Sequence, residues 1–68
     1  MSSKTVNIPN ISCQHCTNTI ERELSELKGV IKVKAEADTK MVTIEWDESA
    51  TDWKQIADLL DDIGFPVN

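Results

Sequence analysis

Residues 30–46, VIKVKAEADTKMVTIEW, decide the fold of this chain because they carry its clearest strand pattern. In residues 30–37 apolar and charged side chains alternate with the period of two that places one set on a buried face. Residues 41–46 alternate in the same way, and the polar residues 38–40 between them predict a turn. The sequence therefore predicts an antiparallel hairpin. Its inward-facing sets are Ile31, Val33, Ala35 and Ala37 in the first strand and Val42, Ile44 and Trp46 in the second.

A helix is predicted on each side of this hairpin. Over residues 15–28 the apolar positions recur at helical spacing, and Gly29 is a usual residue just past a helix end. After the hairpin, Asp52 and Gln55 resemble a capping box, which marks a helix start, and that helix runs to Gly64. The apolar stripes are Cys16, Ile20, Leu24 and Leu27 in the first helix and Ile56, Leu59, Leu60 and Ile63 in the second.

Short strands at both ends complete the predicted sheet. Residues 4–8 alternate as a strand with Val6 and Ile8 inward, and residues 65–67 are predicted as a closing edge strand, where a proline is tolerated. The order βαββαβ predicts an α+β, ferredoxin-like sandwich, with two helices on one face of a four-stranded antiparallel sheet. A chain of this length forms one domain, so we assign residues 1–68 to a single unit.

The reactive groups of the chain lie in residues 11–16, ISCQHC, between the first strand and the first helix. A C-x-x-C pair such as Cys13 and Cys16 can chelate a soft metal ion, act as a redox dithiol, or form half of a four-cysteine zinc site. At a helix start, unpaired N–H groups and the helix dipole favour thiolate over thiol. A disulfide across so short a loop would constrain the unfolded chain little. We therefore expect a chemical role for the pair, in a reducing compartment.

The donor set favours one kind of metal. Two thiolates are soft donors that suit Cu(I) in a near-linear, two-coordinate site. Zn(II) normally takes four ligands, and beyond Cys13 and Cys16 the chain offers His15 and water, so we expect zinc binding to be weaker or intermolecular. His15 has two interpretations: a solvent-facing residue that tunes the charge beside the thiolates, or, less favoured, a direct ligand.

Charge and hydropathy exclude other classes of function. The net charge of −5 disfavours nucleic-acid binding, which needs clustered basic residues. Seven acidic residues lie within residues 45–62 against Lys54 alone, and they either solvate an outer face or form a docking patch for a basic partner. No apolar run is longer than two residues, so we expect neither a signal peptide nor a membrane span, and a soluble, cytosolic protein.

Together these features resemble the heavy-metal-associated domain family, which includes cytosolic copper chaperones and the metal-binding domains of P-type metal ATPases. The resemblance covers nearly the whole chain and extends well beyond the C-x-x-C pair. It is carried by Ser12-Cys13-x-x-Cys16, Gly29-Val30, Val42 and Ile44, Ile56-Ala57, and Gly64-Phe65. It implies a carrier protein rather than an enzyme, with Cys13 and Cys16 as metal ligands and Ser12 in a minor role beside them.

The chain departs from the family pattern at two places. The family usually has Gly-Met before the Ser/Thr-Cys, and here Asn10-Ile11 stands there. We expect Ile11 to serve as the core plug under the loop, and Asn10 would tolerate a positive φ if the backbone required one. Phe65 stands where bacterial chaperones often have Tyr and eukaryotic ones Lys, so it offers the thiolates no hydrogen bond or charge. We expect Phe65 to cover the rear of the loop.

The resemblance implies a Cu(I) chaperone that delivers copper by thiolate exchange to a P-type copper ATPase or a copper-responsive partner. It also allows a metal-bridged homodimer. The first alternative is a detached ATPase domain that prefers Zn(II), Cd(II) or Hg(II). The second is a small thiol oxidoreductase of the thioredoxin class, which the length and the strand order disfavour.

Overall fold

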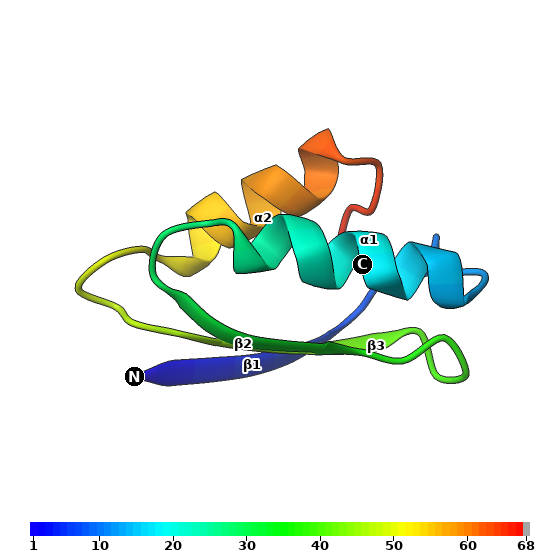
Figure 1. Cartoon of the computed structure of the whole chain (residues 1–68), viewed down its shortest axis with the longest axis horizontal. Helices are drawn as coiled ribbons and strands as arrows, with labels where there is room; N and C mark the ends of the chain where they lie inside the picture. The colour runs from blue at the N-terminus through cyan, green and yellow to red at the C-terminus, as the bar shows by residue number, and fades with distance from the viewer. Residues whose placement is uncertain (68) are drawn as a thin grey trace.

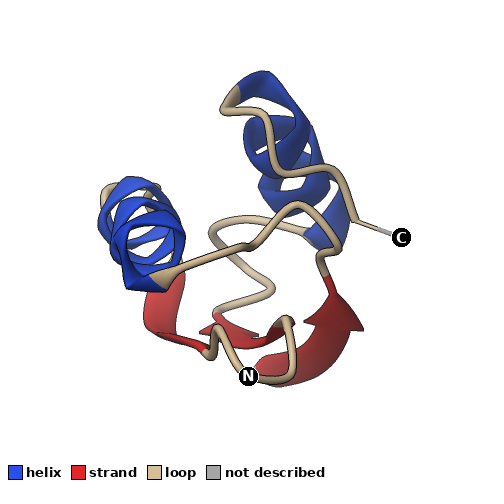
Figure 2. Ribbon diagram, turned by 90° about the vertical axis from the view of Figure 1, so that its right-hand side faces the viewer, coloured by secondary structure: helices blue, strands red, loops and turns tan. Residues whose placement is uncertain are grey.

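Two helices cover one face of a three-stranded antiparallel sheet in the computed structural model, which describes residues 1–67 (Figure 1). The elements, in chain order, are β1 (Ser2–Asn7), α1 (Gln14–Ser25), β2 (Val30–Ala35), β3 (Met41–Trp46) and α2 (Trp53–Asp62). β3 lies between β1 and β2 and pairs with both in antiparallel fashion. Figure 2 shows the two layers from the end, with both helices on the same side of the sheet.

The predicted hairpin is confirmed, but it contains a bulge that the alternation did not reveal. Val30 pairs with Trp46 and Lys32 pairs with Glu45, so Ile31 is an extra residue without a partner on β3. Val33 and Ala35 stay half-buried as predicted, whereas Ile31 and Lys32 are two consecutive exposed residues that interrupt the alternation at the bulge. The expectation that Ile31 faces inward is therefore wrong: its side chain is 53% exposed, and Val30 takes the half-buried position instead.

Other predicted bounds also differ. β1 begins at Ser2 and ends at Asn7, whereas residues 4–8 were the predicted strand. α1 ends at Ser25, three residues early, and the Val30 N–H then bonds to the Leu27 carbonyl at 3.1 Å in a separate turn. Gly29 is the third residue of that turn with a φ of +98°, the left-handed conformation that a type II turn requires there. β2 ends at Ala35, two residues before the predicted end.

The predicted start of α2 at Asp52 is confirmed, and Gly64 stops the helix, although the last helical residue is Asp62. The Asp52 carboxylate accepts a hydrogen bond from the Gln55 N–H at 3.0 Å, which satisfies one of the free donors of the first turn. At the other end the Phe65 N–H bonds to the Leu60 carbonyl at 2.8 Å, and Gly64 has a φ of +91°. This is the glycine-terminated Schellman arrangement, which stops a helix and redirects the chain.

The predicted fourth strand is not shown. Residues 65–67 are described and contain no strand, so the sheet has three strands over the described part of the chain. The physical reason is a shortage of backbone N–H groups that could pair with a neighbouring strand. The Phe65 N–H already bonds to the Leu60 carbonyl at the end of α2, and Pro66 has no N–H. Only Val67 retains an N–H that could pair with an edge, and one residue is too short for a ladder.

The core lies between the sheet and the helices. Its buried side chains are Val6, Ile8, Ile11, Ile20, Leu24, Val42, Ile44, Trp46, Ile56 and Leu60. Trp46 is in the core, as its predicted inward position requires, and Trp53 is half-buried beside it, with ring centroids 5.7 Å apart. The Lys4 Nζ lies over the Trp53 ring, 4.6 Å from its centroid, in a cation–π contact. None of the helices within residues 1–67 has the length and apolarity needed to cross a membrane.

Candidate metal centre

The loop between β1 and α1 begins with a tight turn anchored in the core. The Ile11 N–H bonds to the Ile8 carbonyl at 3.1 Å, which closes a turn around Pro9 and Asn10. Ile8 and Ile11 are both fully buried, so the two ends of the turn are fixed by burial of apolar surface. The expectation that Ile11 acts as the plug under the loop is confirmed.

Polar contacts from distant parts of the chain hold the same turn. The Ile8 N–H donates to the Lys40 carbonyl at 2.8 Å, and Lys40 Nζ donates to the Pro9 carbonyl at 3.4 Å. Asn10 Nδ2 donates to the Gly64 carbonyl at 3.0 Å. Among the described residues Lys40, not Asn10, is the non-glycine residue with positive φ. Sequence reasoning missed the Asn10 contact, for which an amide side chain in a turn is the one available signal.

The two cysteines are brought together at the start of α1. Cys13 is the N-cap residue with an extended backbone, and its carbonyl accepts hydrogen bonds from the N–H groups of Cys16 at 3.1 Å and Thr17 at 3.4 Å. This places Cys16 in the first turn of the helix, as predicted. The two Sγ atoms are 3.9 Å apart and both thiols are free. Cys13 is exposed, while Cys16 is half-buried and packs against the core.

The separation of the sulfur atoms suits a shared soft metal ion. With metal–sulfur bonds of about 2.3 Å, as in zinc thiolates, sulfurs at this distance would subtend an angle of about 116° at the metal. A linear arrangement needs a separation of about 4.6 Å by the same arithmetic. Because Cys13 is exposed, a rotation of its side chain can supply that widening without moving the buried side of the loop.

Hydrogen bonds from Ser12 favour the charged form of Cys16. A backbone hydrogen bond from Ser12 is the largest cause that lowers the Cys16 pKa from its ordinary value of 9.0, and the Ser12 hydroxyl, 3.7 Å from the sulfur, is the second. Partial burial opposes this effect, and the hydrogen bonds from Cys13 add to it. A thiolate is the form that binds metal. The direction of this shift agrees with the expectation from the helix start.

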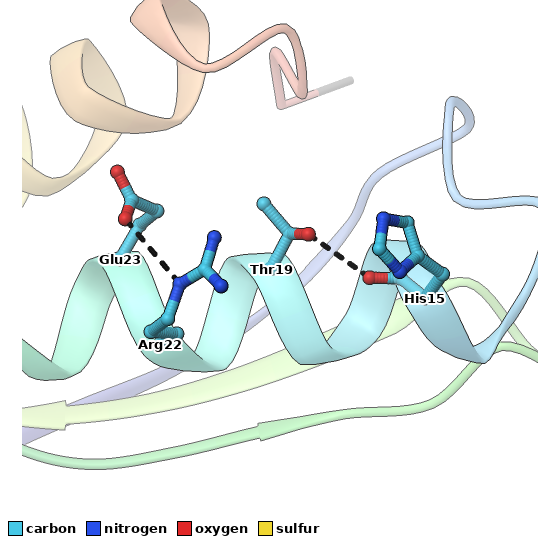
Figure 3. A network of polar contacts seen from close by, with 4 residues as sticks. All are labelled: His15, Thr19, Arg22 and Glu23. Atoms are coloured by element: carbon cyan, nitrogen blue, oxygen red, sulfur yellow. Dashed lines mark hydrogen bonds and ion pairs between the residues drawn. The ribbon is translucent and has the colours of Figure 1, made fainter.

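His15 lies on the exposed first turn of α1. Its carbonyl accepts a hydrogen bond from Thr19 Oγ1 at 3.0 Å, and Figure 3 shows both residues on the helix with Arg22 and Glu23 further along. No group of three or more His, Cys, Asp or Glu side chains within residues 1–67 is arranged to hold a metal ion. The described structure therefore gathers two thiols and no third ligand.

Phe65 and an open groove lie near the loop. Phe65 is half-buried and packs against the core directly after Gly64, whose carbonyl Asn10 binds. Whether Phe65 covers the thiols stays a prediction. A groove of about 260 Å³ runs between the start of α1 and the chain after β2. Its lining residues are Gln14, Thr17, Ala35, Glu36, Ala37 and Asp38.

Comparison with known proteins gives a consistent result. A family model described as the heavy-metal-associated domain matches residues 5–66. Copper chaperone CopZ from Bacillus subtilis (strain 168) is 34% identical over 67 residues, which cover 98% of this chain and 97% of that protein.

Solved structures extend the comparison to the fold. The structure of a CopZ metallochaperone superposes with a TM-score of 0.92 at 27% identity, covering 98% of this chain and all of the other. A copper binding domain from HMA7, a P-type ATPase, superposes with a TM-score of 0.93 at 22% identity, covering 100% of this chain and 92% of that one. At that identity the second likeness concerns the fold alone.

Proposed function

This chain belongs to the heavy-metal-associated domain family, and from that premise we propose that it is a carrier of Cu(I), which it holds between the thiolates of Cys13 and Cys16. The observation that carries the proposal is the pair of free sulfurs 3.9 Å apart on the surface end of a loop whose base is buried. The base of this loop is held by the buried Ile8 and Ile11, whereas the sulfur of Cys13 is accessible to a partner protein. The CopZ relatives are named as copper chaperones, which supports the same cargo.

The choice of Cu(I) over a divalent ion follows from the number and softness of the donors. Two thiolates satisfy Cu(I), whereas Zn(II) requires further ligands that the described residues do not gather. Zn(II) and Cd(II) are therefore the weaker alternatives as cargo, because each would need water or a second molecule to complete its coordination. Two thiolates also satisfy Hg(II), a soft ion, so the number of donors does not separate Hg(II) from Cu(I), and a competition between the two ions tests that alternative.

Transfer proceeds by exchange of thiolate ligands. Because Cys13 is exposed, a thiolate of a docked partner can approach the ion from that side and form a three-coordinate intermediate. One Cu–S bond to this chain then breaks and the second partner thiolate binds. The remaining Cu–S bond to this chain breaks last, so Cu(I) passes to the partner without being released to water. The ion keeps its oxidation state and no substrate is converted into a product, so we propose a carrier and not an enzyme. The same thiolates could bridge two copies of the chain through one ion.

The partner is a protein with its own pair of thiols, such as the metal-binding domain of a P-type copper ATPase or a copper-responsive protein. The docking surface is the loop with the exposed start of α1, because only this surface lets a second pair of sulfurs reach the ion. We place the exchange in the cytoplasm, where thiols stay reduced. The net charge of −5 makes nucleic acid an unsuitable partner.

A titration of the reduced protein against a chromogenic Cu(I) chelator tests the binding step. We expect one tightly held ion per chain, loss of tight binding in Cys13→Ser and Cys16→Ser, and near-normal binding in His15→Ala. The His15 variant is the matched control, because it alters the same loop without removing a sulfur. Equal losses in all three variants would make the imidazole a ligand, and no loss in the cysteine variants would overturn the site.

The approach of the two sulfurs and the lowered Cys16 pKa also suit a thiol oxidoreductase, which is the second candidate. An insulin-reduction assay on the same preparations separates the two functions. We expect no reductase activity above that of free dithiol.

A separate experiment tests the transfer of copper to a partner. Copper-loaded protein is mixed with the apo metal-binding domain of a copper ATPase, and the amide shifts of both proteins are followed. Transfer that is equally fast across a dialysis membrane would exclude direct exchange.

A further inference from the structure

The metal loop is tied to the end of α2 by one side-chain contact. Asn10 Nδ2 donates to the Gly64 carbonyl at 3.0 Å, although the two residues are 54 positions apart. Both partners are exposed, so this bond is not needed to satisfy a buried polar group. It joins the turn before Ser12 to the glycine that ends α2.

The two segments that this bond joins are each fixed at their far side. The turn around Asn10 is held by the buried Ile8 and Ile11. On the other side, Gly64 is held by the Schellman arrangement, and Phe65 packs against the core. The bond therefore joins two segments that are each anchored on the core. A displacement of the metal loop would be transmitted through it to Gly64, and a displacement of Gly64 to the loop.

We propose that Asn10 is a positioning residue that couples the metal loop to residues 64–67, so that loading of the Cys13 and Cys16 pair is sensed at the end of α2. The proposal rests on the metal-binding function proposed above. In the apo protein the bond limits the conformations of the loop that leads to Ser12 and Cys13. A ligand that binds a preorganised loop loses less conformational freedom on binding, so its affinity is higher. By reciprocity, metal binding then strengthens the Asn10 contact.

Asn10→Asp is the sharpest variant because it keeps the size of the side chain and removes the N–H donor. Thr5→Val is the matched control, because it removes an exposed hydrogen bond of the same 3.0 Å length, between Thr5 and Thr43. Both of these residues lie on the face of the sheet that the helices do not cover. Each protein is measured for chemical unfolding, for Cu(I) affinity by chelator competition, and for the Gly64 and Phe65 amide shifts on copper loading. Asn10→Ala repeats the test without the added charge of the aspartate.

We expect both Asn10 variants to bind Cu(I) about two- to tenfold more weakly than the wild-type protein. This is the change in affinity that the loss of one hydrogen bond of typical net strength would cause. We also expect the copper-induced shifts of Gly64 and Phe65 to shrink in these variants and to stay normal in Thr5→Val. If all three variants lose similar stability and keep wild-type affinity and shifts, Asn10 is only a structural contact and the coupling is refuted.

The same measurements separate this inference from the function on which it rests. Absence of tight binding and of shifts at Cys13 and Cys16 in the wild-type protein would refute the carrier function itself. Tight binding with shifts confined to the loop in the wild-type protein would leave the function intact and refute the coupling to residues 64–67.

Discussion

The Ser12 hydroxyl oxygen lies 3.7 Å from the Cys16 sulfur, and Ser12 also provides the backbone hydrogen bond that lowers the Cys16 pKa most. The residue beside the first cysteine therefore stabilises the charge on the second one. Since the metal displaces a proton from each thiol, this contact affects how strongly metal binding depends on pH.

Removing the hydroxyl should raise the Cys16 pKa toward 9.0 without restoring it fully, because the backbone hydrogen bond remains. We expect Ser12→Ala to slow alkylation of Cys16 near neutral pH, measured in a Cys13→Ser background so that only one thiol reacts. Ser25→Ala, on an exposed position at the end of α1, is the control. An unchanged rate profile in Ser12→Ala would show that the hydroxyl does not reach the thiolate in solution.

The same shift gives the pH dependence of folding a definite sign. The pKa of Cys16 is lower in the folded than in the unfolded chain, so folding favours the thiolate. Its contribution is fully present above the ordinary value of 9.0 and is lost as the pH falls through the lowered folded value. We expect the difference in unfolding free energy between the wild-type protein and Cys16→Ser to grow with pH across that window. A difference that shrinks as the pH rises would contradict the assignment.

Apo protein should be folded, because the core is built from strands and helices that do not include the metal. We expect a cooperative unfolding transition by circular dichroism before any metal is added. Copper should then raise the free energy of unfolding by mass action, about 2.7 kcal/mol at a free concentration one hundred times the dissociation constant. An unfolded apo chain would instead make the metal a requirement for folding, as in zinc fingers.

Ile11 and Ile31 should respond very differently to the same substitution. Ile11 is fully buried beneath the metal loop, so Ile11→Ala should cost about 2–5 kcal/mol of unfolding free energy, the usual range for buried isoleucine. Ile31 is 53% exposed at the bulge, so Ile31→Ala should change stability by about 0.5 kcal/mol or less. Urea denaturation measures both. A larger loss at Ile31 would mean that the bulge does not exist in solution.

The two glycines provide a second matched pair. A Cβ atom at Gly29 would lie 2.8 Å from Thr51 Cγ2 and 2.9 Å from Ala50 Cβ, whereas a Cβ at Gly64 would meet nothing within 4 Å. Both have positive φ, so each alanine variant pays for backbone strain, about 1 kcal/mol. We expect Gly29→Ala to be clearly the more destabilised in thermal unfolding, because only there must neighbouring atoms also move. Equal melting temperatures would contradict the close packing at Gly29.

The sequence alone determined the elements that depend on local signals. The hairpin, the Asp52 cap, the Gly64 stop and the position of Cys16 in the first turn of a helix were all predicted, because side-chain periodicity and capping act within a few residues. The pairing of two thiols at a helix start was predictable for the same reason, since residues three apart at that place are close in any fold.

Only the tertiary structure decided the features that depend on residues far apart in the chain. The bulge at Ile31 depends on its register with β3. Residues 65–67 form no strand because the Phe65 N–H bonds to the Leu60 carbonyl at the end of α2. The bond from Asn10 to the Gly64 carbonyl depends on how the metal loop and α2 pack over one core. These contacts join segments that periodicity treats separately, because local patterns fix which face is buried but not which distant group lies opposite it.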